Sequence, residues 1–460
     1  MANGKSGERS VALNLSLLDE KDREELLDKT ESPRENNRTR TEDRTAHEWY
    51  RFVLSFPPHL VRDCVTKFQL DENSCVLDPF CGTGTTVVEC KRLGIPSVGT
   101  ERNPMAWFAS NTKTNWSVNP DALWQHAKRI AEVVNERLES QGLGGVSGPL
   151  FPSNGLETSL KKLPHDAERL LLKSSICPKP LHKALMLKEA IAEFEDSEFT
   201  AHEQLGLAKT IVSDISNLHF GPEVGVKAPR IDAPAVTSWL DRVRIIAEDL
   251  RLLNAKQHTG TIVHRTDSRD LSSVLSPESI DAVITSPPYP NEKDYTRTTR
   301  LESVILGFLR SKEDLRDLKY GLVRSNTRSV YKSDSDDSFV ADNAEVQRIA
   351  AAIEARRIEL GKTSGFERLY PRLTQLYFGG MHRHLANLRK FLRPKAQLAY
   401  VVGDQASYLR VMIRTGQILA QIAESLGYEV TGIDLFRTRL ATATREQLRE
   451  EVVLLRWNPK

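Results

Sequence analysis

Cysteine is scarce in this 460-residue chain: there are five, and no two of them form a C-x-x-C pair. An odd, small number in a chain of this length excludes a disulfide scaffold and indicates a reducing compartment. His and Cys do not recur at the spacing of a zinc site either, so we expect no metal. These absences predict a globular protein without disulfide or metal cross-links.

Long apolar runs are lacking as well. No stretch is long enough to span a membrane, and the N-terminus carries no secretory apolar region, so we expect no membrane partner and a cytoplasmic location. Charge of one sign is also lacking, because 64 basic and 62 acidic residues give a net charge of +2. That balance alone says nothing about a polyanionic partner. The 39% hydrophobic and 27% charged residues describe a globular chain of two or three domains.

The most informative pattern is the run at residues 76–86, Val-Leu-Asp-Pro-Phe-Cys-Gly-Thr-Gly-Thr-Thr. It reads as a strand, a glycine loop and the start of a helix, which together form a nucleotide-type cofactor site at the carboxyl end of a strand. Gly82 and Gly84 allow a tight turn and a close approach to a ligand. Val87 stands where a dinucleotide loop has its third glycine, and no Lys follows Gly84 as in a phosphate-binding P-loop.

A second pattern lies at residues 281–289, Asp-Ala-Val-Ile-Thr-Ser-Pro-Pro-Tyr. A short apolar strand runs into a turn in which two prolines remove N–H donors and fix φ. The carbonyls of Ser286 and Pro287 are thereby left as acceptors, and Tyr289 supplies an aromatic face. An exocyclic amine on a nucleobase is a weak nucleophile, so acceptors must hold its hydrogens while a platform receives the base outside the helix stack. With Pro288, this turn meets those needs.

Together the two motifs resemble those of the amino-methylating DNA methyltransferases, the N4-cytosine and N6-adenine enzymes that use S-adenosylmethionine. The resemblance implies that Phe80 lies against this cofactor and that Asp78 lies near its methionine end. The cofactor-binding residues it implies are Asp78, Phe80, Gly82, Gly84, Thr85, Glu101 and Asp267, and the catalytic residues are Ser286, Pro287, Pro288 and Tyr289.

Two of these acids follow predicted strands. Glu101 ends the strand at 97–101, where this architecture holds a ribose diol. Asp267 comes just after the strand at 261–264 and resembles the position that touches the cofactor's adenine, although an Asp there also suits a helix N-cap. The aromatic segment at 47–61 is loosely similar to the motif that lines the methionine end of the cofactor. It could equally be an N-terminal helix packed on the sheet.

The residue before the prolines indicates which base is methylated. Enzymes of this family that act on adenine N6 usually have Asp or Asn at the position of Ser286, and Thr285-Ser286 resembles the N4-cytosine type. Three alternatives stay open: N6-adenine methylation of DNA, methylation of an RNA amine, and a catalytically silent nucleic-acid-binding protein. Cytosine C5 methylation is disfavoured because it needs a cysteine nucleophile, and Cys81 lies in the cofactor loop instead.

The element order predicts a doubly wound, Rossmann-like class I methyltransferase sheet with an antiparallel last strand and an inserted helical module. The segment between the two motifs is far longer than a βαβ progression needs, and its apolar residues recur at helical spacing. The expected divisions are a mobile charged segment at 1–45, a catalytic domain at 46–115 and 260–460, and the helical module at 116–259 as a candidate target-recognition region.

The implied partner is double-stranded DNA, with a cognate restriction enzyme acting on the same site. Residues 366–395 carry seven Lys or Arg against one acid, which suits a phosphate backbone or a solvated helix face. Residues 291–395 are therefore a second candidate for target recognition. His382 and His384 are too few for a zinc site, so we expect them to face solvent or nucleic acid. We expect the charged stretch at 311–365 to be mobile.

Overall fold

The computed structural model describes residues 40–51, 55–143, 160–221, 223–440 and 447–459, all within the compact unit Thr39–Lys460. Most of the predicted N-terminal segment, residues 1–39, lies outside the described residues, as do residues 52–54 of the aromatic segment. Among the described residues, no helix combines the length and the apolar character needed to cross a membrane.

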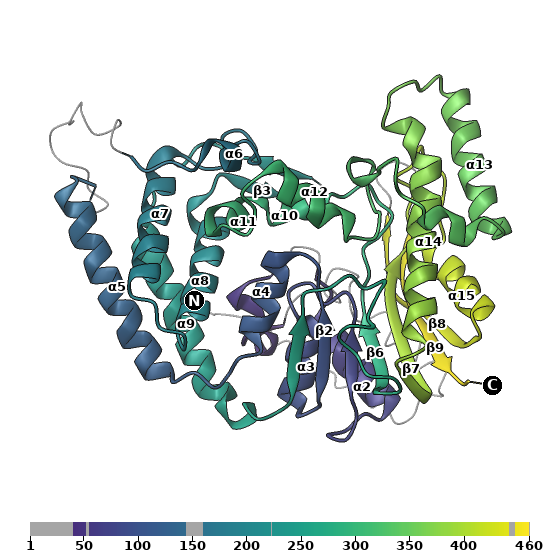
Figure 1. Cartoon of the computed structure of the whole chain (residues 1–460), viewed down its shortest axis with the longest axis horizontal. Helices are drawn as coiled ribbons and strands as arrows, with labels where there is room; N and C mark the ends of the chain where they lie inside the picture. The colour runs from purple at the N-terminus through teal and green to yellow at the C-terminus, as the bar shows by residue number, and fades with distance from the viewer. Residues whose placement is uncertain (1–39, 52–54, 144–159, 222, 441–446, 460) are drawn as a thin grey trace, which may run out of the picture. The chain divides into compact units, whose positions relative to one another are not determined.

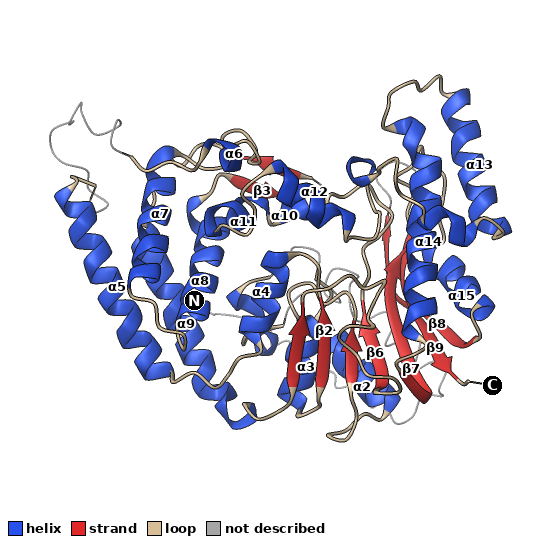
Figure 2. Ribbon diagram, viewed as in Figure 1, coloured by secondary structure: helices blue, strands red, loops and turns tan. Residues whose placement is uncertain are grey.

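A seven-stranded sheet forms the centre of this unit, in the order β5-β2-β1-β6-β7-β9-β8 (Figure 2). The strands from β5 to β7 pair in parallel, and β9 runs antiparallel to both of its neighbours. Its strands are β1 (Val76–Asp78), β2 (Ser97–Thr100), β5 (Thr261–His264), β6 (Ile280–Thr285), β7 (Leu392–Gly403), β8 (Tyr428–Leu440) and β9 (Gln447–Trp457). This arrangement confirms the predicted class I methyltransferase fold.

Burial on both faces explains why the central strands are nearly continuous apolar runs. Val76 and Ala282 pack on one face with helix α2, whereas Leu77 and Val283 pack on the other face with α14 and α15. Figure 1 labels the helices, which are α2 (Pro58–Phe68), α3 (Thr85–Leu93), α4 (Pro104–Lys113), α10 (Tyr295–Thr298), α11 (Arg300–Leu306), α12 (Lys312–Tyr320), α13 (Ala344–Glu359), α14 (Tyr370–Leu388) and α15 (Thr415–Ser425).

The chain order places the two sequence motifs side by side. From β1 the sheet grows outward through β2 to β5, and the chain then returns to lay β6 against the other side of β1. Leu77 pairs with Val283, so the carboxyl ends of β1 and β6 meet. A reversal of strand order of this kind is where open α/β sheets bind ligands. The glycine loop and the Ser-Pro-Pro-Tyr turn both leave the sheet at this point.

The described residues of 120–143, 160–221 and 223–253 are mostly helical, and the helices share one apolar core with α11. They are α5 (Pro120–Ser140), α6 (His165–Glu168), α7 (Pro178–Glu193), α8 (Thr200–Thr210) and α9 (Ala235–Leu253). The region is not helical throughout, because it also contains an antiparallel pair, β3 (Leu218–Phe220) and β4 (Val224–Val226). Helix α8 is followed by a π turn at Ile211–Ile215. The functional division of this region stays a prediction.

The expected mobility of residues 311–365 is not what the structure shows. The stretch contains α12, the 3-10 helix η8 (Asp336–Val340) and α13. Two of its acids are buried and paired: Asp334 accepts from Arg324 at 2.7 Å, and Asp336 accepts from Arg269 at 2.5 Å. The charge content of this stretch predicted a solvated, mobile segment. It could not indicate the pairing, because Arg269 is distant in sequence and the Arg324–Asp334 pair depends on how the chain turns between them.

Candidate functional site

Asp78 lies at the end of β1, and its side chain is fully buried. Its Oδ1 accepts hydrogen bonds from the Thr285 hydroxyl at 2.6 Å and from the Phe80 N–H at 3.1 Å. Its Oδ2 has no hydrogen-bond partner among the described residues. Burial raises the pKa of Asp78 to about 6, although these hydrogen bonds act in the opposite direction. A desolvated carboxylate with an unused oxygen is suited to an ammonium ligand.

The glycine loop curves tightly beside Asp78. Gly82 and Gly84 have φ values of +52° and +90°, a region that side-chain-bearing residues rarely adopt. A Cβ atom on Gly84 would also lie 3.0 Å from the Cβ of Ser110 in α4. Helix α3 begins at Thr85, so the backbone N–H groups of its first turn lack intrahelical acceptors and lie next to the loop. This geometry suits a polar or anionic group of a ligand.

Glu101 directly follows β2, the strand next to β1. Its Oε2 accepts from the Gly82 N–H at 2.9 Å, and its Oε1 accepts from the Asn103 N–H at 2.7 Å. Burial raises the pKa of Glu101 to about 7, against the effect of these two amides. Two backbone donors therefore fix the carboxylate's direction before any ligand arrives, as holding a diol requires.

Phe80 packs edge-on against His384, with 4.9 Å between the ring centroids. His384 in α14 is fully buried. Its Nδ1 donates to the Ser268 carbonyl at 2.8 Å, and its Nε2 accepts from the Tyr400 hydroxyl at 2.7 Å. The expectation that His384 faces outward is therefore wrong, because two distant polar partners satisfy its ring inside the core. The buried His384 ring thus packs against Phe80 from within the core.

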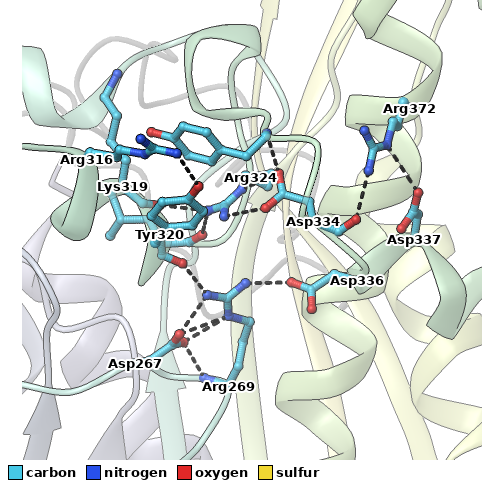
Figure 3. Close-up of polar contacts among 12 residues, drawn as sticks. Asp267, Arg269, Arg316, Lys319, Tyr320, Arg324, Asp334, Asp336, Asp337 and Arg372 are labelled. Atoms are coloured by element: carbon cyan, nitrogen blue, oxygen red, sulfur yellow. Dashed lines mark hydrogen bonds and ion pairs between the residues drawn. The ribbon is translucent and has the colours of Figure 1, made fainter.

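Asp267 follows β5, and its carboxylate faces Arg269 (Figure 3). The Arg269 Nη2 donates to Asp267 Oδ2 at 2.7 Å, while the Asp267 side chain keeps 27% exposure. The N-cap alternative does not fit, since a turn rather than a helix follows Asp267. The Arg269 contact could not be predicted from the sequence, because Arg269 is an ordinary basic residue in a polar turn.

The Ser-Pro-Pro-Tyr turn is held from two sides. The Ser286 hydroxyl donates to the Val401 carbonyl at 3.1 Å, which leaves its oxygen lone pairs as acceptors. The Tyr289 N–H donates to the Tyr295 hydroxyl at 3.0 Å. A Cβ atom on Gly403 would lie 3.0 Å from Cε2 of Tyr289, so this glycine lets the ring approach the end of β7.

The two prolines of the Ser-Pro-Pro-Tyr turn and one lysine of α4 also belong to the candidate site. Pro287 is buried and Pro288 is half-buried. Lys113, which the sequence analysis did not select, is buried in α4 and donates to the Thr83 carbonyl at 2.7 Å and the Tyr50 carbonyl at 3.3 Å. It thereby ties the aromatic N-terminal segment to the glycine loop. The sequence around Lys113 carries no signal for this contact, because both acceptors are main-chain carbonyls of other segments.

The structure brings the predicted residues to one edge of the sheet. In strand order they are Asp267 after β5, Glu101 after β2, Asp78 to Thr85 after β1, and Ser286 to Tyr289 after β6. Across the described ranges, no group of three or more His, Cys, Asp or Glu gathers as a metal would need. The chemistry available is therefore acceptor positioning, aromatic stacking and carboxylate binding.

Several basic residues of 366–395 are paired with acids or carbonyls of the chain itself. Arg372 contacts Asp337 at 3.3 Å, and Arg393 contacts Asp281 at 2.6 Å. The Arg389 Nη1 donates to a main-chain carbonyl at 2.8 Å. These pairs reduce the positive charge that this stretch presents, so its predicted role on a phosphate backbone rests on the sequence alone.

Several known proteins have sequences similar to this chain. A family model of the N6/N4 type, described as DNA methylase, matches residues 12–108. The chain is 25% identical over 447 residues to the type II methyltransferase M.BsoBI of Geobacillus stearothermophilus, which covers 90% of this chain and 84% of that protein. It is 22% identical over 436 residues to the type II methyltransferases M.AvaI of Nostoc sp. (strain PCC 7120) and of Anabaena variabilis, covering 89% of this chain and 86% of each.

Proposed function

We propose that this chain is an amino-methylating DNA methylase, as its similarity to such enzymes supports, and that it transfers a methyl group from S-adenosylmethionine to the N4 amine of cytosine at a specific site in DNA. The observation that carries this proposal is the contact between the two motifs. Thr285 bonds to Asp78 at 2.6 Å, and Ser286 is the next residue along. The cofactor loop and the base-holding turn are thereby fixed against each other, as direct transfer requires.

The residues at the strand ends fit S-adenosylmethionine. The unused oxygen of Asp78 suits its ammonium group, Glu101 its ribose diol, Phe80 its hydrophobic surface and Asp267 its adenine. Gly82, Gly84 and Thr85 would shape the loop around it. When bound, the cofactor supplies an electrophilic methyl group on a sulfonium sulfur.

The chain's own residues would then position the amine. The flipped cytosine would rest on the Tyr289 ring, while the oxygens of Ser286 and Pro287 hold the two amine hydrogens. The amine nitrogen forms the new N–C bond with its lone pair as the S–C bond breaks. The bonding pair leaves with sulfur as a neutral thioether, and the amine releases one proton to solvent. Catalysis is mostly positioning, so no cysteine, metal or redox group is needed.

Two observations favour cytosine N4 over other targets. Ser286 offers a neutral acceptor at the position where adenine N6 enzymes of this family usually carry Asp or Asn. Methylation at C5 would need a thiolate, and burial raises the pKa of Cys81 well above its ordinary value. N6-adenine methylation is the alternative that keeps the same geometry. The relatives are named type II methyltransferases, which supports double-stranded DNA as substrate and a cognate restriction enzyme as partner.

The proposal is tested with the purified full-length chain and S-adenosylmethionine carrying a labelled methyl group. We expect label to enter double-stranded DNA and not RNA, and Ser286→Ala to lower the rate about 100-fold. Ser140→Ala is the matched control, because this exposed serine lies at the end of α5. Label entering RNA alone, or equal rates for Ser286→Ala and Ser140→Ala, would overturn the proposal.

A further inference from the structure

Arg269 is a buried cation that joins three separate stretches of the chain (Figure 3). Its side chain is 6% exposed and donates to Asp267 through Nε at 3.0 Å and Nη2 at 2.7 Å. Its Nη1 donates to Asp336 at 2.5 Å, and its Nη2 also donates to the Tyr320 carbonyl at 2.9 Å. Every nitrogen of the guanidinium is thereby committed.

The stretch held at Tyr320 also lies against the neighbouring strand end. A Cβ atom on Gly321 would come within 2.2 Å of Nε of Arg102, so glycine is required unless that side chain moves. Arg102 directly follows Glu101. The same two residues, Tyr320 and Gly321, are therefore in contact with the turns after both β5 and β2, where the cofactor's adenine and ribose are proposed to bind.

Asp336, the other partner of Arg269, is fixed to α14. Its carbonyl oxygen would lie 1.8 Å from a Cβ atom on Gly379, so the backbone of η8 reaches the helix only through a glycine. Its Oδ1 also lies 3.3 Å from Nη1 of Arg383. Arg269 thus connects Asp267 to a rigid element instead of leaving it on a free turn.

The stretch between these two contacts also supports the turn after Tyr289. The Glu292 N–H donates to the Ser325 carbonyl at 3.1 Å. The Asn326 side chain donates to the Lys293 carbonyl at 3.2 Å. Residues 320–336 therefore contact the cofactor side of the site at one end and the base-binding side in the middle.

The charges make this arrangement interdependent. Burial alone would lower the pKa of Arg269, but the hydrogen bonds and charges of Asp267 and Asp336 raise it above its ordinary value. Removing one partner of a buried ion pair leaves the remaining charge uncompensated, so the others must move or draw in water. Removal of the Asp336 carboxylate should therefore change the position or the hydration of the Asp267 carboxylate.

We propose that Arg269 is a positioning residue for S-adenosylmethionine: it aims the Asp267 carboxylate at the cofactor's adenine end, and it does so only while Asp336 holds its other side. This inference rests on the proposed function, because it takes Asp267 as a cofactor residue. Asp336 then influences cofactor affinity without touching the cofactor.

The test measures S-adenosylmethionine binding by calorimetry on the full-length chain and on Asp336→Ala, Arg269→Lys and the double variant. Each single change should weaken binding about tenfold, and the double variant should be no weaker than either, because both act through one contact set. Asp337→Ala is the matched control, since Asp337 neighbours Asp336 but pairs with Arg372 instead. It should bind as the unchanged chain does.

The outcomes separate this inference from the proposed function. If the unchanged chain binds no S-adenosylmethionine, the proposed function and the inference both fail. If it binds and methylates DNA but Asp336→Ala binds equally tightly, only the inference fails. Multiplying losses in the double variant would also overturn it. If Asp336→Ala does not fold, Arg269→Lys alone tests the inference, because lysine keeps the charge and loses the forked geometry. Unchanged affinity of Arg269→Lys for S-adenosylmethionine would contradict the inference.

Discussion

The Thr285 hydroxyl donates a 2.6 Å hydrogen bond to the Asp78 carboxylate across the boundary between β6 and β1. Both groups are fully buried. The bond joins the last residue of one motif's strand to the last residue of the other's. It holds the turn that begins at Ser286 in a fixed position relative to the glycine loop.

Thr285→Val removes this bond with little change in shape. A hydrogen bond to a charged group contributes about 1.5–3 kcal/mol, so its loss should raise the pKa of Asp78 by about one unit or more. Binding of S-adenosylmethionine needs the ionised carboxylate, and its pH midpoint should move upward by a similar amount. Calorimetric titrations from about pH 5 to 8 measure the midpoint. A profile identical to that of the unchanged chain would show that Asp78 does not meet the cofactor.

Asp78→Asn should stabilise the unliganded protein while weakening cofactor binding. The folded pKa of about 6 lies above the ordinary aspartate value of 3.8, so folding opposes ionisation. The resulting penalty is absent below the unfolded pKa, grows as pH rises through the folded pKa and reaches about 3 kcal/mol at neutral pH.

Urea unfolding checks this sign. The Asn variant should gain about 1–3 kcal/mol at neutral pH, and the gain should shrink as pH falls below about 6. An Asn variant that is less stable than the unchanged chain at neutral pH would contradict the assignment of Asp78 as a ligand-binding carboxylate whose ionised form destabilises the fold.

Tyr289→Ala should lower the turnover rate about 10- to 100-fold, because it removes the surface on which the flipped base stacks. Tyr289→Phe keeps the ring against Gly403 and should retain most of the activity. Steady-state rates on saturating DNA compare the two. Equal losses in both variants would point to the hydroxyl instead of the aromatic face.

Gly379→Ala should destabilise the fold, although alanine favours helices by about 1 kcal/mol over glycine. The new Cβ would lie 1.8 Å from the Asp336 carbonyl, a backbone atom that cannot move independently. A net loss of about 2 kcal/mol in unfolding free energy is expected. Gly365→Ala is the control, since nothing lies within 4 Å of its Cβ position. Similar stabilities for the two variants would refute the close approach of η8 to α14.

Local patterns carried most of what could be predicted from the sequence. The strand at β1, the glycine loop and the strand at β6 each have their apolar run and turn residues next to one another, so their order fixes the sheet. The Asp-rich stretch around Asp336 and the ring of His384 were misjudged for the opposite reason. Their partners, Arg269 and Tyr400, lie elsewhere in the chain, and no local rule connects them.

The same limit applies within the candidate site. Glu101 could be selected because an acid at the end of a second strand has a known place in this architecture. Lys113 and Arg269 could not, since each acts through carbonyls or carboxylates that only the folded chain brings near. The hairpin of β3 and β4 was missed because its strands are three residues each, too short for a period of two to be visible.

The central claim is the identity of the methylated base. Nucleoside mass spectrometry of DNA from cells expressing the chain tests it, beside cells expressing the Ser286→Ala, Tyr289→Ala double variant. N4-methylcytosine should accumulate with the unchanged chain and be absent with the variant. N6-methyladenine in its place would keep the mechanism but contradict the assignment of cytosine, and the absence of both marks would contradict the account as a whole.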